Sequence, residues 1–219
     1  MSNLRGARRL LLLALALLLA GCGATRTEAA EGADPGADAP GRAIFAAGCF
    51  WCVEEAFERI DGVREVISGY TGGDARNPSY RQVTAGGTGH HEAVEVRYDP
   101  EQVDYAELLS VFWRNVDPTD DRGQFCDRGP SYRGAVFPLD DAQRAAAEAS
   151  KGALQEDPRA PTPIVTPILD AGRFWRAEDY HQDYYRKNPL RYRFYKNACG
   201  RAARLEELWG EYEPTFAGR

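Results

Sequence analysis

Cys49 and Cys52 form a Cys-x-x-Cys pair at the point where an apolar strand pattern changes into a helical pattern. The run 44–46 is apolar and extended in character, whereas Phe57 and Ile60 recur at helical spacing. A thiol at a helix N-terminus meets unpaired N–H groups, which favour the nucleophilic thiolate. The sequence therefore makes Cys49 a candidate nucleophile. A buried structural cysteine is the competing interpretation, because cysteine is among the most buried residue types.

The remaining cysteines are Cys22, Cys126 and Cys199. Four thiols downstream of Cys22 could form two structural disulfides in an exported protein. Cys49 and Cys52 are too close in sequence to close a stabilising loop, and pairs at this spacing more often do redox chemistry. The cysteine pattern therefore favours an oxidoreductase.

The N-terminal segment has the pattern of a bacterial lipoprotein signal peptide. A start with three arginines precedes an apolar run of eleven residues over 10–20. That run is shorter than the roughly 20 residues of a membrane-spanning helix. The sequence Leu19-Ala20-Gly21-Cys22 resembles a lipobox, so we expect a lipid on Cys22. The protein is then anchored in the bacterial cell envelope, on the periplasmic side or the cell surface; an ordinary secretory signal is the alternative.

Composition and charge set the domain organisation and exclude one class of partner. The 219 residues carry a formal net charge of −6, with no lysine or arginine block that could follow a phosphate backbone, so we expect no nucleic acid. The expected divisions are a signal peptide over 1–21, a flexible acidic tether over 22–41, a folded domain over 42–210 and a tail over 211–219.

The elements that must position the cysteines follow from the apolar periodicity. Strands are predicted over 44–46, 63–68, 92–98, 135–137 and 164–168. Helices are predicted after Cys49, over 104–115, 140–155 and 177–187, and as a short turn over 205–209. This order predicts a single two-layer α+β domain. Its mostly antiparallel central sheet is flanked by helices, and a long irregular C-terminal segment follows.

Seven ordered motifs together resemble the A-type peptide-methionine (S)-S-oxide reductases. They are GCFWCVEEAF (48–57), SGYTGG (68–73), NPSYRQV (77–83), TGHHEAVEVRYDP (88–100), FWRNVDPTD (112–120), GQFCDRGPSYR (123–133) and AEDYHQDYYRKNP (177–189). The resemblance implies reduction of the S epimer of methionine sulfoxide, free or in oxidised exported proteins, through a cysteine sulfenic acid and a disulfide relay. It also implies no bound cofactor, a thioredoxin-like dithiol as reductant, and a monomer.

The resemblance further implies a role for each of seven residues. Cys49 would attack the sulfoxide sulfur, and Glu92 would protonate the leaving oxygen. Burial at a strand start could keep this glutamate protonated near neutrality. The remaining groups would be the hydrogen-bond donors Tyr80 and Tyr132, the walls of a methyl pocket Phe50 and Trp51, and Asp127, which would orient the substrate amide.

The sequence departs from the family at the thiols that would regenerate the enzyme. Most members have glycine where Cys52 stands, and many hold the recycling cysteine in a glycine-rich tail. The candidates for the resolving thiol are Cys199, Cys52 and Cys126. We expect a Cys49–Cys199 bond first, because the segment around Cys199 has little apolar periodicity and could swing over the pocket. Cys52 or Cys126 would then relay toward the external donor, and a Cys52–Cys126 pair is an open alternative.

Three competing interpretations remain at this point. A membrane-tethered dithiol–disulfide oxidoreductase would use Cys49-x-x-Cys52 but would leave Glu92 without a task. A non-enzymatic lipoprotein that presents a binding surface would need no reactive thiol. A metal centre would use His90, His91 and His181 with Glu92, but these lack the ligand spacing of a zinc protease, so we expect no metal.

Overall fold

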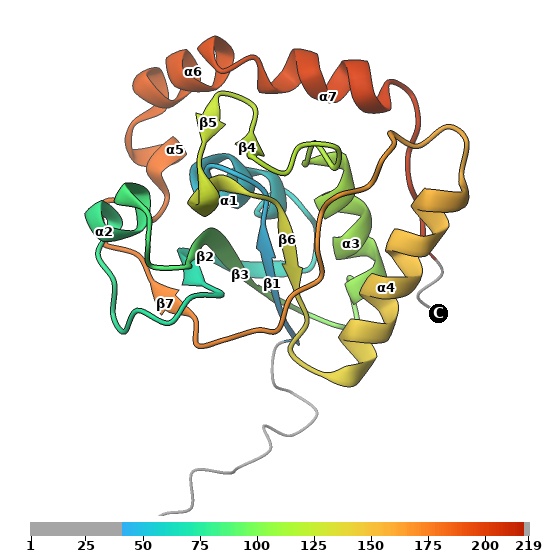
Figure 1. Ribbon diagram of the computed structural model, residues 1–219, viewed down its shortest axis with the longest axis horizontal. Helices are drawn as coiled ribbons and strands as arrows, with labels where there is room; N and C mark the ends of the chain where they lie inside the picture. The colour runs from blue at the N-terminus through green and yellow to red at the C-terminus, as the bar shows by residue number, and fades with distance from the viewer. Residues whose placement is uncertain (1–40, 217–219) are drawn as a thin grey trace, which may run out of the picture. The chain divides into compact units, whose positions relative to one another are not determined.

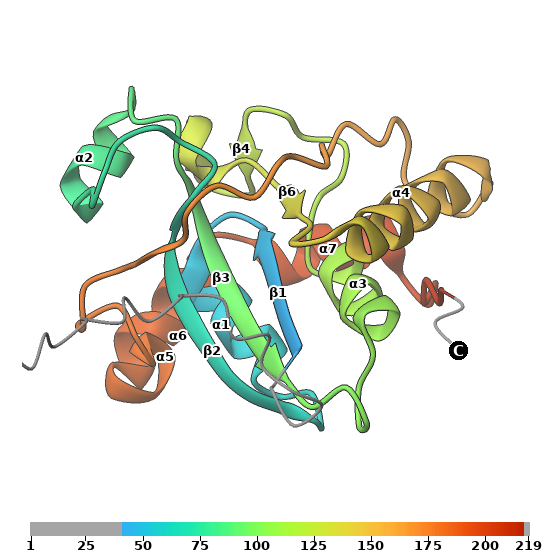
Figure 2. The ribbon, with the colours of Figure 1, turned by 90° about the horizontal axis from the view of Figure 1, so that it is seen from below.

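A five-stranded sheet organises the computed structural model, which describes residues 41–216. All of its strand pairs are antiparallel, and the strands follow the order β6-β1-β3-β2-β7 (Figures 1 and 2). Their bounds are β1 Gly41–Ala46, β2 Val63–Thr71, β3 His91–Tyr98, β6 Ala135–Phe137 and β7 Trp175–Arg176. The central position of β3 buries nearly all of its residues, although its sequence alternates like that of a half-exposed strand.

Helices lie around this sheet, and capping residues explain where two of them begin. The side chains of Asp104 and Asp140 accept hydrogen bonds from the backbone N–H groups of Glu107 and Gln143, which caps the helices that follow. A hairpin of β4 Gly123–Gln124 and β5 Asp127–Arg128 precedes a 3-10 turn, η1 Pro130–Tyr132. The helices are α1 Phe50–Phe57, α2 Tyr80–Ala85, α3 Tyr105–Arg114, α4 Asp141–Glu156, α5 Tyr184–Lys187, α6 Pro189–Ala198 and α7 Arg201–Trp209.

The two faces of the sheet bury different sets of apolar side chains, because successive strand residues point in opposite directions. Phe45 of β1 joins the larger core, where its ring stacks on Phe57 of α1 at 5.0 Å and on Phe112 of α3 at 5.3 Å. Its neighbour Ile44 joins a smaller cluster that is covered by side chains from the segment 169–174. The first core holds α1 against β2 and β3, and so sets the position of Cys49.

The predicted α+β class and mostly antiparallel sheet are confirmed, but the C-terminal half differs from the prediction. The predicted strand over 164–168 is wrong: this segment makes a single parallel bridge between Ile168 and Val136. Pro167 lies within it and has no N–H to donate to a strand partner. The helix predicted over 177–187 is limited to the short α5.

The C-terminal segment that was predicted to be irregular contains α6 and α7, which follow one another along the top of Figure 1. The apolar periodicity of the sequence did not predict α6, because this helix buries only Tyr192 in the core. Leu190 and Phe194 of the same helix are 76% and 77% exposed. Cys199 therefore lies in a tight connection between two helices, not in an unstructured tail.

The predicted signal peptide over 1–21, its lipid-bearing Cys22 and the tether up to residue 40 lie outside the described residues. Within 41–216, no helix combines the length and apolar character that crossing a membrane requires.

Candidate active site

Eight side chains from six elements line a cavity of about 50 Å³ at the N-terminal end of α1. They include all seven residues to which the sequence assigned a catalytic or pocket role. The eighth, Tyr195 of α6, was not predicted. The lining residues are Cys49, Phe50, Trp51, Tyr80, Glu92, Asp127, Tyr132 and Tyr195.

Cys49 occupies the N-cap position of α1, as the strand-to-helix pattern predicts. Gly48 before it has φ +84°, and a Cβ there would lie 2.6 Å from the Gln124 side chain, so both conformation and space require glycine. The expectation that the helix N-terminus favours the thiolate is not met. Burial raises the pKa of Cys49 well above its ordinary value, and the neighbouring Cys52 and the Glu92 carboxylate raise it further. Burial is the largest of these causes.

The pKa of Cys52 is shifted in the opposite direction from that of Cys49. It lies one turn further along α1 and is 5% exposed. A hydrogen bond from Cys49 lowers the pKa of Cys52 to about 6 against the effect of burial, and the charge of Arg201 adds to the lowering. The two thiols are therefore in direct contact, and this contact raises the pKa of Cys49 while it lowers that of Cys52.

Glu92 is 2% exposed near the start of β3, and its carboxylate faces the first turn of α1. The Phe50 backbone N–H donates a hydrogen bond of 3.1 Å to Glu92 Oε2. Burial nevertheless raises the pKa of Glu92 to about 8, with a further contribution from the charge of Asp127. The group is therefore mostly protonated at neutral pH and can deliver a proton into the cavity.

Tyr80 and Tyr132 meet across the cavity, where their hydroxyl groups are hydrogen bonded to each other. Burial raises the pKa of both, so both keep their protons and remain donors. The Tyr80 backbone N–H donates to Glu178 Oε1 at 2.9 Å, and Tyr70 donates to the other oxygen of Glu178 at 2.8 Å. Glu178 thereby ties the start of α2 to β2.

Trp51 and Phe50 form an apolar wall that His181 and the first residue of α5 hold in place. Trp51 stacks on Tyr184 with ring centroids 3.8 Å apart, and its indole N–H donates to His181 Nδ1 at 3.1 Å. The His181 ring also lies 4.8 Å from the Phe50 ring. Burial lowers the pKa of His181 to about 4, so the ring is neutral and can accept this hydrogen bond. The sequence did not predict this role for His181.

Asp127 of β5 receives a hydrogen bond of 2.5 Å from the hydroxyl of Tyr195. Tyr195 also contacts Cys49, so one side chain of α6 connects the nucleophile candidate with the aspartate. Burial raises the pKa of Asp127, and the Tyr195 hydrogen bond opposes this effect. No motif in the sequence marks Tyr195, because its place in the cavity depends on the path of α6.

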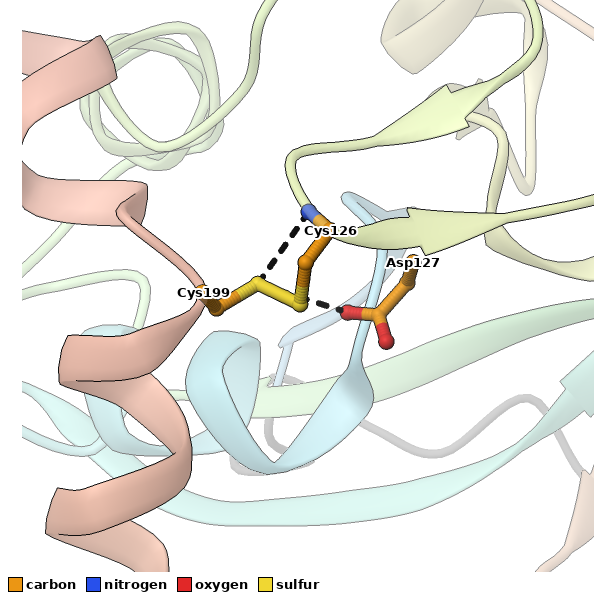
Figure 3. A group of neighbouring side chains, drawn as sticks. All are labelled: Cys126, Asp127 and Cys199. Carbon is orange, nitrogen blue, oxygen red and sulfur yellow. Dashed lines mark hydrogen bonds between the residues drawn. A yellow bond between two sulfur atoms is a disulfide. The ribbon is translucent and has the colours of Figure 1, made fainter.

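Cys126 and Cys199 form a disulfide beside this cavity (Figure 3). The Cys126 backbone N–H donates to Cys199 Sγ at 3.2 Å, and this sulfur lies 4.0 Å from Asp127 Oδ2. Among the described residues the free cysteines are Cys49 and Cys52. The structure therefore differs from the alternative Cys52–Cys126 pairing. It also shows Cys199 bonded to Cys126 in place of the expected Cys49.

The residues of the competing metal interpretation do not converge. His90 contacts the Ala75 carbonyl and the Gly73 N–H, whereas His91 contacts the Arg133 carbonyl. His181 is engaged with Trp51. These separate contacts account for the three histidines without a shared ligand.

Comparison with protein families gives a match over residues 41–213 to the family described as peptide methionine sulfoxide reductase. The chain is 50% identical over 172 residues to peptide methionine sulfoxide reductase MsrA 2 of Rhizobium meliloti, which covers 78% of this chain and 85% of that protein. It is 49% identical over 168 residues to MsrA of Bacillus subtilis, which covers 77% of this chain and 95% of that protein.

Solved structures of two proteins are also similar to this chain. Mxr1 from Saccharomyces cerevisiae in reduced form is similar with a TM-score of 0.65 and 31% identity, over 69% of this chain and 87% of that chain. Methionine sulfoxide reductase A of Corynebacterium diphtheriae is similar with a TM-score of 0.60 and 33% identity, over 71% and 78%. The chain therefore belongs to the peptide methionine sulfoxide reductase family and reduces methionine sulfoxide through cysteine redox chemistry.

Proposed function

We propose that Cys49 attacks the sulfur of methionine sulfoxide while Glu92 protonates the sulfoxide oxygen. The observation that carries this assignment is that both side chains line one small cavity with two protonated tyrosines. The pKa of about 8 for Glu92 means that the proton donor is loaded at neutral pH. Protonation makes the sulfur more electrophilic and so compensates for a nucleophile whose own pKa is raised.

The step balances in electrons and atoms. The Cys49 thiol and the sulfoxide become methionine and a Cys49 sulfenic acid, so that methionine gains two electrons and the cysteine sulfur loses two. Glu92 delivers its proton to the sulfoxide oxygen, and the proton that the Cys49 thiol loses on attack restores the protonated Glu92, so the step is also balanced in protons.

Polar groups select the S epimer in this proposal. Burying one methyl group contributes only about 0.8 kcal/mol. Leaving a buried hydrogen-bond donor unpaired costs roughly 1–3 kcal/mol. The hydroxyls of Tyr80 and Tyr132 therefore discriminate the direction of the sulfoxide oxygen, while Phe50 and Trp51 hold the S-methyl group. Asp127, held by Tyr195, orients the substrate amide.

The resolving thiol of the fully reduced enzyme is Cys199 in this proposal, with Cys126 as the next member of the relay. Cys199 would attack the Cys49 sulfenic acid, giving a Cys49–Cys199 bond and water. Cys126 would then attack Cys199 and release Cys49. The Cys126–Cys199 bond of the structure fits the end of this sequence, and Cys126 is exposed to a protein donor. A thioredoxin-like dithiol would reduce that bond.

The location of the enzyme rests on the N-terminal sequence. We propose that Cys22 carries a lipid that anchors the protein to the bacterial envelope, where it repairs oxidised exported proteins. We also propose that the enzyme acts as a monomer, because the eight lining residues of one chain suffice for the proposed chemistry.

Turnover on separated sulfoxide epimers with dithiothreitol tests the catalytic assignment. The wild-type protein should reduce the S epimer, and Cys49→Ser should abolish reduction because a hydroxyl is a far weaker nucleophile. Cys199→Ser is the matched control for the first round of reduction, since it removes a sulfur but keeps Cys49, Cys52 and Glu92. Turnover of the Cys49→Ser variant within tenfold of wild type would refute the role of Cys49. Efficient reduction of a protein disulfide instead of the sulfoxide would favour the dithiol oxidoreductase.

A further inference from the structure

The first turn of α1 separates two cavities, and each contains one of the two adjacent thiols. Cys49 lines the small cavity of about 50 Å³ described above. Cys52 lines a second cavity of about 470 Å³, bounded by α1, α3, α6, α7 and the C-terminal segment. In the described part of the chain, the two cavities share no lining residue. The contact between Cys49 and Cys52 therefore lies between the sulfoxide pocket and the second cavity.

The second cavity has the size of a small-molecule site, since such sites usually enclose about 300–1,000 Å³. Its lining carries four cationic and two acidic side chains, a net charge of +2 in a protein whose net charge is −6. The cationic groups are Arg59, Arg114, Lys196 and Arg201, and the acidic groups are Glu55 and Glu213. Glu213 is 70% exposed, so solvent screens its charge more than that of the buried Arg201.

The sulfoxide pocket lacks this positive charge. Asp127 lines it, Glu92 is mostly protonated at neutral pH, and no lysine or arginine is among its lining residues in the described chain. An anionic molecule is therefore repelled where Cys49 lies and attracted where Cys52 lies.

We propose that the cavity lined by Cys52 binds a small carboxylate-bearing thiol, which reduces a Cys49–Cys52 disulfide by attacking Cys52. This inference rests on the proposed role of Cys49. It applies to the state of the structure, in which Cys199 is bonded to Cys126 and Cys52 is the thiol in contact with Cys49. It differs from the relay through Cys199, which ends at a protein dithiol.

The chemistry balances in three steps. The Cys52 thiolate attacks the Cys49 sulfenic acid, which forms the Cys49–Cys52 bond and releases the oxygen as water after proton uptake. A thiolate in the second cavity then attacks Cys52 Sγ, forms a mixed disulfide with it and expels the Cys49 thiolate into the sulfoxide pocket. A second thiol molecule attacks the sulfur of the bound ligand, which releases Cys52 and a small-molecule disulfide. Two thiols are oxidised for each methionine sulfoxide reduced.

Two features near Cys52 suit this reaction. Arg201 is 3% exposed and donates to the Ala47 and Asn115 carbonyls, so its charge is fixed beside the sulfur. The hydroxyl of Tyr192 is hydrogen bonded to Cys52 as well as to Glu55. These groups stabilise the Cys52 thiolate each time it is released.

Three monothiols of similar size and different charge test the inference: 3-mercaptopropionate, 2-mercaptoethanol and cysteamine. The protein is first air-oxidised so that peptide mapping finds Cys126–Cys199 closed, and is then given one equivalent of methionine sulfoxide. The rate of reduction of the new bond by each thiol is divided by the rate of the same thiol with an uncharged small disulfide. We expect the normalised rate with 3-mercaptopropionate to exceed that with cysteamine by about tenfold or more. Added salt should reduce the ratio of these two rates.

Arg59→Gln is the cavity variant, because the Arg59 side chain is 69% exposed and its removal leaves the core intact. Arg144→Gln on α4 is the matched control, since Arg144 lines neither cavity and pairs with Glu148 and Asp170. We expect the charge preference to fall several-fold in Arg59→Gln and to stay unchanged in Arg144→Gln. Acid-quenched mapping should find the mixed disulfide on Cys52.

The result that overturns the inference differs from the one that overturns the catalytic assignment. A mixed disulfide on Cys49, a Cys49–Cys199 bond with free Cys52, or equal normalised rates for the three thiols at low salt would refute the small-thiol site. Each of these results would leave sulfoxide reduction by Cys49 in place. Absence of any sulfoxide reduction by the wild-type protein would instead refute the proposed role of Cys49.

Discussion

The backbone N–H of Phe50 donates a hydrogen bond of 3.1 Å to Glu92 Oε2, and this bond joins the first turn of α1 to the start of β3. Cys49 precedes Phe50, so the same contact fixes the distance between the proposed nucleophile and the proposed acid. The hydrogen bond favours the ionised carboxylate, but burial prevails and the pKa of Glu92 stays at about 8. The site therefore keeps a protonated carboxyl group, the proposed acid, next to the proposed nucleophile.

Glu92→Gln should lower kcat/KM by about 10²–10⁴-fold at neutral pH, because glutamine keeps the hydrogen-bonded shape but cannot deliver a proton. The wild-type rate should fall as the pH rises through about 8, where Glu92 loses its proton. That decline should be absent from the residual activity of the variant. Rates measured from pH 6 to 10 check this. An unchanged rate and pH profile would show that another group supplies the proton.

The same residue should make stability depend on pH. The pKa of Glu92 is higher in the folded state than in the unfolded state. Its contribution to the free energy of unfolding is therefore fully present below about pH 4.3, and this contribution is lost as the pH rises toward about 8. Glu92→Gln should therefore raise the free energy of unfolding at pH 8 relative to wild type, and should change it less at pH 5. Urea unfolding at both pH values measures the difference. Equal effects at the two values would contradict the raised pKa.

Cys199→Ser should still complete one round of sulfoxide reduction per enzyme but should recycle poorly with thioredoxin. The reason is that the proposed protein-dithiol route ends at the Cys126–Cys199 bond. In fully reduced wild-type protein, peptide mapping after one equivalent of substrate should find Cys49 joined to Cys199. Finding Cys49 joined to Cys52 or Cys126 with Cys199 free would contradict this order of bonds.

His181→Phe should raise KM more than it lowers kcat, because it removes the acceptor of the Trp51 indole N–H and loosens the apolar wall. An unpaired buried donor costs roughly 1–3 kcal/mol, of which part will appear in substrate binding. His181→Asn offers an amide oxygen as a substitute acceptor and should restore part of the loss. Steady-state kinetics on a sulfoxide-containing peptide measure the effect. Loss of kcat alone in both variants would argue against a positioning role.

Cys22→Ala should block lipid attachment and release the protein from membranes, if the N-terminal motif acts as a lipobox. Partitioning of wild type and variant into detergent and aqueous phases checks this, and mass spectrometry of the wild-type N-terminus detects the lipid. Ser2→Ala is the control, because it lies outside the motif. A variant that still partitions fully with membranes would show that another feature holds it there.

The sequence by itself determined the class of the fold, and it predicted seven residues that the structure brings into one cavity. Cys49, Glu92, Tyr80 and Tyr132 each lie in a local motif, and local motifs record which strand, turn or helix presents a side chain. The apolar periodicities around them were sufficient for the α+β class, because short-range spacing decides between strand and helix. The segment at 164–168 was predicted incorrectly because an apolar run resembles a strand even where a proline prevents pairing.

Only the tertiary structure decided the properties that depend on burial and on contacts distant in sequence. Cys126 and Cys199 are 73 residues apart, and no spacing rule identifies them as partners. Tyr195 reaches the cavity because α6 passes beside it, although α6 has almost no apolar periodicity. The raised pKa of Cys49 follows mainly from burial, which the N-terminal position on a helix does not reveal. Desolvation and long-range proximity arise only when the whole chain packs, so local sequence cannot contain them.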